Sequence, residues 1–317
     1  MKELIRKANV VYVCSGTKVI DGVDTGRDAI VVGVTHKIAI KDFKKAGLKK
    51  QDAIPTKVHG KETDVVETGE IKALRTSKHR PAPGGVSIGH PNITAGTLGM
   101  VIPTDSGRYI LSNNHVLANS NDASIGDETW QPGAYDGGVS IDVIGHLFDF
   151  VPIVFLGGES TCPIGNTIVC VFNFLAKLFG RKTRIRTIVD IMNTVDCAIA
   201  EPINDSDVSE EILEIGVPIG FSKAIVGEKV KKSGRTSGLT EGTVSSTDTL
   251  ANVNYGDGKM ATFTDQIMTT AMSEGGDSGS VVLNEVIEVV GLLFAGSDQV
   301  TIVNKISNVL TELGLNG

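Results

Sequence analysis

Between about residue 85 and residue 305, the sequence is a succession of short β-prone runs separated by Gly, Asp and Asn. The runs include "RYILSNNHVLA", "VDCAIAEP", "EGTVSSTDTL" and "VVGLLFAGS". Short strands at this spacing are typical of β-barrels and β-sandwiches. The 37 glycines among 317 residues agree with a mostly β, turn-rich protein.

The two ends of the chain have different patterns. Residues 1–80 predict a separate small α+β module of unknown role, because "NVVYVCSGTKVIDG" and "DAIVVGVTHKIAI" are strand-like and a basic, polar segment follows them. The Pro- and Gly-rich "KHRPAPGGVSIGH" then indicates a linker. At the other end, the helical periodicity of "ISNVLTEL" predicts a C-terminal helix over 306–314.

Residues 146–190 interrupt the strand pattern with an apolar and then basic insert. Within it, "NTIVCVFNFLAKLFGR" predicts a helix that is apolar over most of its circumference, and it leads into "RKTRIR". We expect this helix to be buried against the barrels or a neighbouring subunit, so the insert is a candidate contact for a homo-oligomer. The alternative is a helix on a membrane surface or a partner. Membrane contact is not expected, because no apolar run reaches the roughly 20 residues that span a bilayer.

Composition and short motifs exclude several classes of protein. The net charge of -7 argues against nucleic-acid binding. No P-loop or EF-hand pattern is present, so neither a cofactor nor a metal site is expected. The N-terminus lacks the apolar core of a secretory signal, and the cysteines fit no C-x-x-C motif. We therefore expect a cytoplasmic protein with free thiols at Cys14, Cys162, Cys170 and Cys197.

Ser278 lies in "EGGDSGS", between two strand-like runs, where the glycines permit a sharply turned backbone. A nucleophilic serine needs a base and a group that orients the base. Of the six histidines, His115 is the one at the end of a strand-like run, in "YILSNNHVLA". Asp196, in "NTVDCAIAEP", is a carboxylate in an apolar stretch, and an imidazole N–H would satisfy it. Taken singly, each residue also fits a structural role in a loop, a core or a strand cap.

Together and in this order, "SNNHV", "VDCAIA" and "GGDSGS" resemble the three signatures of chymotrypsin-fold (trypsin-like) serine proteases. The segments "KKSGRTSGLTEGTV" and "TTAMSEGGDSG" are similar to those of bacterial, streptogrisin-like members. The resemblance implies a protease domain over 81–317 with two six-stranded antiparallel β-barrels. The first barrel would occupy about 85–203, including the insert, and the second about 217–305.

The resemblance also implies residue roles. Ser278 would attack a peptide carbonyl, with His115 as general base and Asp196 fixing the tautomer of the imidazole. The backbone N–H groups of Gly276 and Ser278 would form the oxyanion hole. The carboxylate of Asp277, which precedes the nucleophile, would need a buried partner.

The segment "KKSGRTSG" resembles the streptogrisin segment that supplies an internal basic partner, which implies that an internal cation satisfies Asp277 and that the intact chain is active without trimming of its N-terminus. The alternative is that the basic residues of this segment are solvated on a hairpin. By spacing in "KKSGRTSG", Lys232 is the nearest candidate and Arg235 is the alternative.

The pocket for the residue before the scissile bond should prefer apolar side chains. None of its expected wall residues is acidic, and Leu293 stands where glutamate-specific members have a histidine. Phe294 stands where the family usually has a serine that hydrogen-bonds the triad acid. The expected wall consists of Met272, Ser273, Leu293, Phe294, Ala295 and Gly296.

The sequence therefore predicts an intracellular serine endopeptidase that acts on protein or peptide substrates. A pseudo-protease or assembly scaffold with a gated, unused triad is the first alternative, because the extra module and the insert could hold the cleft shut. An esterase that uses the same triad is the second.

Overall fold

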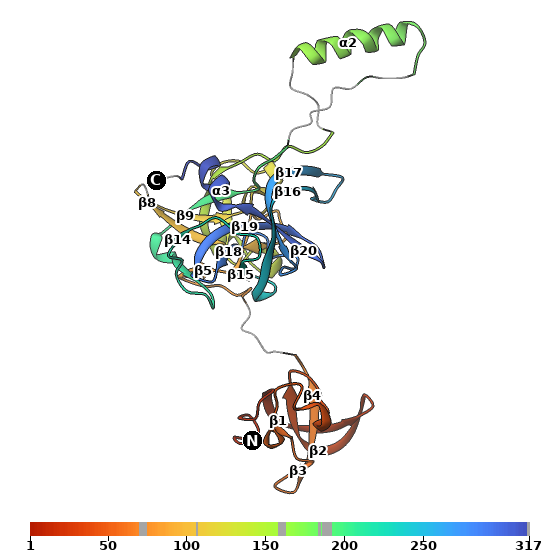
Figure 1. The fold of residues 1–317 in the computed structure, drawn as a ribbon, viewed down its shortest axis with the longest axis vertical. Helices are drawn as coiled ribbons and strands as arrows, with labels where there is room; N and C mark the ends of the chain where they lie inside the picture. The colour runs from red at the N-terminus through yellow and green to blue at the C-terminus, as the bar shows by residue number, and fades with distance from the viewer. Residues whose placement is uncertain (70–74, 106, 158–162, 183–184, 186–191, 316–317) are drawn as a thin grey trace. The chain divides into compact units, whose positions relative to one another are not determined.

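The computed structural model forms two compact units, Met1–Leu74 and Arg75–Gly317 (Figure 1). It describes residues 1–69, 75–105, 107–157, 163–182, 185 and 192–315. Strands dominate both units, and the predicted mostly β class is confirmed.

The first unit is built on a four-stranded sheet in the order β1-β2-β4-β3. A tight hairpin joins its first two strands through Asp21 and Gly22, whose φ angles of 50° and 81° are those of a type I′ turn. The buried side chains of Leu4, Ile30 and Val32 form its core. Its elements are β1 (Val10–Ile20), β2 (Val23–Val34), η1 (Ile40–Asp42), η2 (Lys50–Asp52), β3 (Lys57–Val58) and β4 (Lys61–Glu67).

The first half of the second unit contains a five-stranded antiparallel sheet in the order β10-β11-β12-β9-β8. Among the described residues, this sheet has five strands where a six-stranded barrel was expected, and a single bridge between Gly89 and Trp130 extends it. The elements of this half are β5 (Ala82–Gly84), β6 (Ser87–Ile88), β7 (Gly96–Thr97), β8 (Met100–Thr104), β9 (Gly107–Ser112), α1 (Asn114–Leu117), η3 (Asn119–Asn121), β10 (Glu128–Trp130), η4 (Ala134–Asp136), η5 (Ser140–Asp142), β11 (Val143–Phe150), α2 (Pro163–Leu178) and β12 (Ala198–Pro202).

The second half contains a closed barrel. Six strands follow one another in the order β19-β18-β15-β16-β17-β20, and pairing between β20 and β19 closes the ring, while β14 adds to β19 in parallel. The elements are η6 (Asp205–Asp207), β13 (Val208–Ile212), β14 (Gly220–Phe221), β15 (Lys229–Gly234), β16 (Gly238–Asn254), β17 (Met260–Thr270), β18 (Val281–Asn284), β19 (Glu288–Gly296), β20 (Val300–Lys305) and α3 (Ile306–Glu312).

A shared apolar core joins the two halves of this unit. It combines side chains of the five-stranded sheet, such as Leu111 and Ile199, with Leu283 and Leu292 of the barrel and Val309 of α3. All five are at most 1% exposed. Because interiors pack densely, this core fixes how the loops at the ends of the two sheets meet.

The boundaries of the insert differ from the sequence-based expectation. β11 continues to Phe150 and pairs with β12, so residues 146–150 belong to the sheet and not to an insertion. The predicted helix is present as α2, but its apolar side chains are exposed and not buried against the barrels; Phe174 is 64% exposed. No helix in the described part of the chain is long and apolar enough to cross a membrane.

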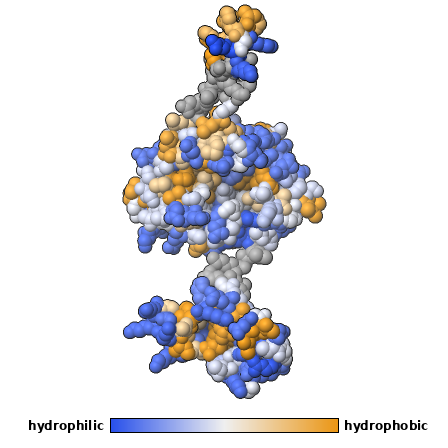
Figure 2. Space-filling view, turned by 90° about the vertical axis from the view of Figure 1, so that its right-hand side faces the viewer, coloured by the Kyte–Doolittle hydropathy of each residue, from blue (hydrophilic) through white to orange (hydrophobic). Residues whose placement is uncertain are grey.

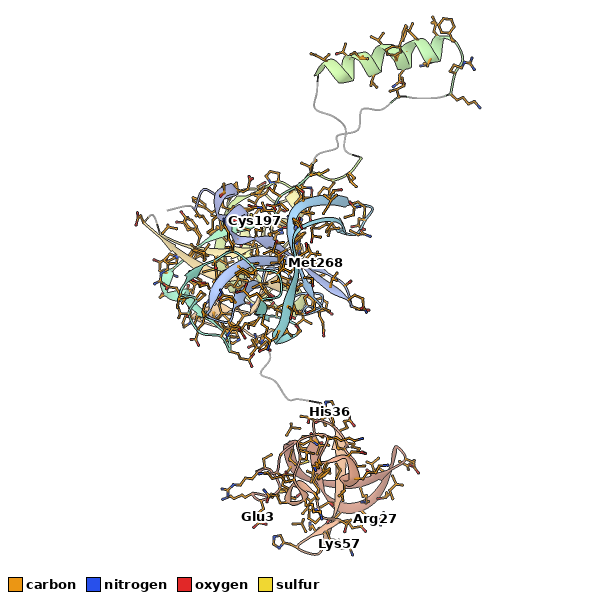
Figure 3. The ribbon with its side chains drawn as sticks, in the orientation of Figure 1. Glu3, Arg27, His36, Lys57, Cys197 and Met268 are labelled. Atoms are coloured by element: carbon orange, nitrogen blue, oxygen red, sulfur yellow. The ribbon has the colours of Figure 1, made fainter. Side chains whose placement is uncertain are left out.

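The described cysteines carry free thiols. Cys14 and Cys170 are exposed, whereas Cys197 is buried in the second unit, Arg75–Gly317 (Figure 3). Burial raises the pKa of the Cys197 thiol well above its ordinary value, and this thiol is therefore unreactive. The predicted thiol of Cys162 lies outside the described residues.

Candidate active site

His115 and Asp196 meet because their strands are neighbours. His115 lies in the one-turn helix α1, directly after β9, and Asp196 directly precedes β12. The two strands are antiparallel with Ser112 opposite Ala198, so the end of one strand lies beside the start of the other. His115 Nδ1 is 2.6 Å from Asp196 Oδ2, and the His115 backbone N–H donates to Oδ1 at 3.3 Å.

The backbone around Asp196 is held by two amide side chains. Its N–H donates to Asn304 Oδ1 at 3.0 Å, and its carbonyl accepts from Asn113 Nδ2 at 2.7 Å. The Asp196 side chain is fully buried, whereas His115 is 21% exposed. The carboxylate is therefore inaccessible to solvent, while the imidazole reaches the surface of a cavity.

Tyr255 supplies a further hydrogen bond to this carboxylate, and sequence reasoning missed it. Its hydroxyl donates to Asp196 Oδ2 at 2.8 Å, and its ring meets the His115 ring edge-on with centroids 5.7 Å apart. Burial, followed by the charge of Asp196 and the bond to it, raises the pKa of Tyr255 well above its ordinary value. The hydroxyl therefore remains a donor throughout the range in which an imidazole titrates.

Tyr255 lies in the turn between β16 and β17, 59 residues after Asp196 in the sequence. No local pattern in "NYGDGK" indicates this contact. The available signal in the sequence was Phe294, which stands where the family usually has a serine that hydrogen-bonds the triad acid. Its presence implied that another group must donate a hydrogen bond to Asp196. The Phe294 ring itself is 3% exposed and packs against Phe263.

Ser278 faces the same cavity as His115. The cavity has a volume of about 600 Å³, and Tyr255 and Phe294 also line it. Ser278 Oγ donates to the carbonyl of Phe294 at 3.3 Å, and no hydrogen bond joins it to the His115 ring among the described residues. Hydrogen bonds of catalytic groups are often long or misaligned in the absence of substrate, so a change of the Ser278 rotamer remains compatible with a triad.

The turn before Ser278 has a defined shape. Asp277 N–H donates to Glu274 O at 3.0 Å, and Gly276, the third residue of the turn, has a φ of 97°. A type II turn requires positive φ at that position. A Cβ on Gly276 would approach Thr236 Oγ1 to 2.5 Å, so space as well as conformation demands glycine.

Thr236 also orients the peptide between Gly275 and Gly276. Its hydroxyl donates to the Gly275 carbonyl at 2.7 Å. In a planar trans peptide the C=O and N–H point in opposite directions. The N–H of Gly276 therefore points away from Thr236. Together with the N–H of Ser278, it is the predicted donor pair for an anion.

The carboxylate of Asp277 is fully buried and accepts five hydrogen bonds. Lys232 Nζ donates at 2.9 Å, and the Ser237 hydroxyl donates to the same oxygen. The backbone N–H groups of Thr236, Ser237 and Glu274 supply the other three, at 2.8, 3.0 and 2.9 Å. Burial would raise the pKa of Asp277, but the charge of Lys232 and these bonds outweigh it and hold the pKa below its ordinary value.

Of the two cations considered for Asp277, Lys232 is the one that reaches it. Burial lowers the pKa of Lys232, and the attraction of Asp277 opposes that effect. Arg235 instead donates two hydrogen bonds to the Asp136 carboxylate, from Nε at 2.7 Å and from Nη2. Its guanidinium also lies over the ring of Tyr135.

A second cavity of about 600 Å³ opens beside Ser278. Four predicted wall residues line it, namely Ser273, Leu293, Ala295 and Gly296. Met272 is instead packed in the barrel core, and Phe294 lines the His115 cavity. Two carboxylates that sequence reasoning missed, Glu274 and Asp298, also line the second cavity, and both residues are exposed.

Comparisons with known proteins give short but close matches. The chain is 48% identical to "Serine protease 1" of Streptomyces fradiae over 56 residues, which are 18% of this chain and 14% of that protein. It is 47% identical to "Glutamyl endopeptidase 2" of Streptomyces griseus over 58 residues, 18% of this chain and 28% of that protein. The predicted resemblance to trypsin-like, streptogrisin-like serine proteases is confirmed over these segments. No protein-family model matches the chain.

Solved structures of similar proteins include Thermobifida fusca Protease A, at 17% identity and a TM-score of 0.45, with 73% of this chain and 95% of that chain covered. A glutamic acid-specific serine protease matches at 21% identity and a TM-score of 0.45, with 73% and 97% covered.

Replacing Lys232 by Ala is expected to lower the free energy of unfolding by about 3–5 kcal/mol, because it leaves a buried carboxylate without its cation. Urea unfolding at neutral pH measures this change. Lys231→Ala, one residue away on the same strand and half-buried, is the matched control and should cost far less.

The pH dependence of the free energy of unfolding is a second test of the Lys232–Asp277 ion pair. The folded-state pKa of Asp277 is lowered, so its contribution is complete above the unfolded pKa of about 3.9 and is lost as pH falls through the folded value. Equal stability losses in the Lys231 and Lys232 variants would contradict the assignment.

Proposed function

We propose that this chain is a serine endopeptidase that uses Ser278, His115 and Asp196. The supporting observation is the 2.6 Å contact between His115 Nδ1 and the buried Asp196 carboxylate, at a cavity that Ser278 also lines. The names of the two Streptomyces relatives support the same reaction class.

In the proposed reaction, Ser278 Oγ attacks the peptide carbonyl while His115 Nε2 takes its proton. Asp196 holds the imidazole through Nδ1–H and stabilises the imidazolium. The N–H groups of Gly276 and Ser278 bind the developing oxyanion, and each such donor contributes about 2.7–4 kcal/mol. His115 then protonates the leaving amine, and water releases the acyl group by the same steps in reverse.

We also propose that the intact chain is competent. The turn that forms the oxyanion site needs a satisfied Asp277, and Lys232 from β15 is already in contact with it. No new N-terminus is then required to neutralise the carboxylate. The exposed free thiols of Cys14 and Cys170 support a reducing, cytoplasmic setting for such an enzyme.

A pseudo-protease is the second candidate, and one observation favours it. The Ser278 hydroxyl is bonded to the Phe294 carbonyl and not to His115. In that role the same residues would form a rigid scaffold without turnover.

A fluorophosphonate probe should label the uncleaved 317-residue protein. Ser278→Ala should abolish labelling, and His115→Ala and Asp196→Asn should each reduce peptide hydrolysis by roughly 10⁴-fold or more. Ser245→Ala, at an exposed serine outside the site, is the control and should behave as wild type. If the probe does not label the wild-type protein and the protein is inactive, it is a pseudo-protease. If the probe labels the protein and the protein hydrolyses esters but not peptides, it is an esterase.

Tyr255→Phe should lower the free energy of unfolding and shift the pH dependence of kcat/KM, with KM nearly unchanged. The phenyl ring keeps the packing, whereas the lost bond to a carboxylate is worth about 1.5–3 kcal/mol. Without that donor, Asp196 stabilises the imidazolium more strongly, so the acid limb of kcat/KM should move to higher pH. The control is Tyr135→Phe, at an exposed tyrosine. A pH profile identical to that of wild type would show that Tyr255 acts only by packing.

We propose a preference for apolar residues before the scissile bond and discrimination against acidic ones. The inner wall of the second cavity is apolar at Leu293 and Ala295, and the carboxylates of Glu274 and Asp298 repel an acidic side chain. Peptides with Leu, Phe, Met or Ala at this position should be cleaved fastest. Those with Glu should be cleaved most slowly, despite the name of one relative. A peptide-library profile dominated by Glu would overturn this assignment.

A further inference from the structure

Helix α2 presents large apolar side chains to solvent. Phe174 is 64% exposed, Leu178 69% and Ile164, near the start of the helix, 73%; Phe179, the residue after the helix, is 76% exposed. Figure 2 shows hydrophobic residues gathered on this segment. Exposed apolar surface of this density on one short element marks a site of interaction.

The apolar residues share one side of the helix. On a helical wheel with 100° per residue, the exposed large apolar residues occupy an arc of nearly half the circumference, bounded by Phe174 on one side and Phe172 on the other. Asn173 and Lys177 lie on the opposite side of the wheel. Asn173 bonds both backbone groups of Ile185, each at 2.8 Å. Ile185 therefore lies against the polar stripe, on the side of the helix opposite the large apolar residues.

The same segment has a one-sided charge. Between residues 160 and 189 there is no Asp or Glu, although the chain has 37 of them, while five of its 30 Lys and Arg lie there. Three of these cations are in the described part, at the C-terminal end of α2. The five are Lys177, Arg181, Lys182, Arg184 and Arg186.

These features favour one occupant over the others. A second copy of α2 would bring like charges together, which disfavours self-association. A broad apolar face, followed at the C-terminal end of the helix by cations, fits the boundary between anionic headgroups and acyl chains. We propose that α2 is a monotopic anchor that lies in the plane of an anionic membrane surface. Its Phe-rich side enters the acyl boundary, and the cations just beyond its C-terminal end, Arg181 and Lys182, meet the phosphates. This proposal departs from the sequence-based expectation of no membrane contact.

The test uses the full chain with Ser278→Ala and phosphatidylcholine vesicles with or without phosphatidylglycerol. The protein should sediment with the phosphatidylglycerol vesicles at least tenfold more strongly, and added salt should weaken the binding. Phe174→Glu with Leu178→Glu should reduce binding at least tenfold. Ile219→Glu, at a residue 70% exposed elsewhere in the chain, is the control and should not.

A spectroscopic variant separates insertion from adsorption. The chain has one tryptophan, so Phe174→Trp adds a second fluorophore whose emission should shift to the blue on phosphatidylglycerol vesicles. Ile219→Trp should show no shift. Absence of vesicle binding, or binding unaffected by the paired Glu substitutions, overturns the proposal. A lipid-independent dimer in sedimentation velocity, dissolved by Phe174→Glu without any vesicle binding, would identify a second copy as the occupant. None of these readouts depends on peptidase activity.

Discussion

The buried ion pair between Lys232 and Asp277 is the interaction on which the site depends. Its carboxylate collects donors from β15, from the turn that follows β15 and from the start of the nucleophile loop. A buried charge must be satisfied or it destabilises the fold, so these segments are held together by one electrostatic requirement. The type II turn at Gly276 and the orientation of its peptide follow from that arrangement.

The two buried aspartates of the site are stabilised in different ways. Asp277 has the Lys232 ammonium in contact, so its charge has a counter-charge in the resting structure. The side-chain partners of Asp196 among the described residues are the Tyr255 hydroxyl, the His115 ring and the His115 backbone N–H. In the proposed reaction its charge gains a full counter-charge when the imidazolium forms. A cationic partner suits Asp277, whose proposed role is structural. Uncharged hydrogen-bond donors suit Asp196, whose proposed role is to stabilise the imidazolium that forms in each turnover.

The sequence motifs predicted contacts between residues that lie at the ends of paired strands. His115 and Asp196 meet because β9 and β12 are antiparallel neighbours, an arrangement that the resemblance implied. The choice between Lys232 and Arg235 followed spacing within one short segment, in which Lys232 lies on β15 and Arg235 just after it. Tyr255 could not be predicted, because its contact depends on the length and curvature of the β16–β17 hairpin and not on nearby residues. Glu274 and Asp298 were missed for the same reason: each reaches the cavity from a loop whose path no periodicity specifies. The pattern of α2 predicted an apolar helix, but a single-chain pattern contains no information on what covers it.

The hydrogen bond from Tyr255 to Asp196 crosses the boundary between the two halves of the larger unit. Tyr255 belongs to the closed barrel and Asp196 to the five-stranded sheet, and Ser278 faces His115 across the same boundary. A displacement of one half by about 1 Å lengthens these contacts together, although both sheets keep their own hydrogen bonds. The proposed activity would therefore be more sensitive to the relative position of the two halves than their secondary structure is.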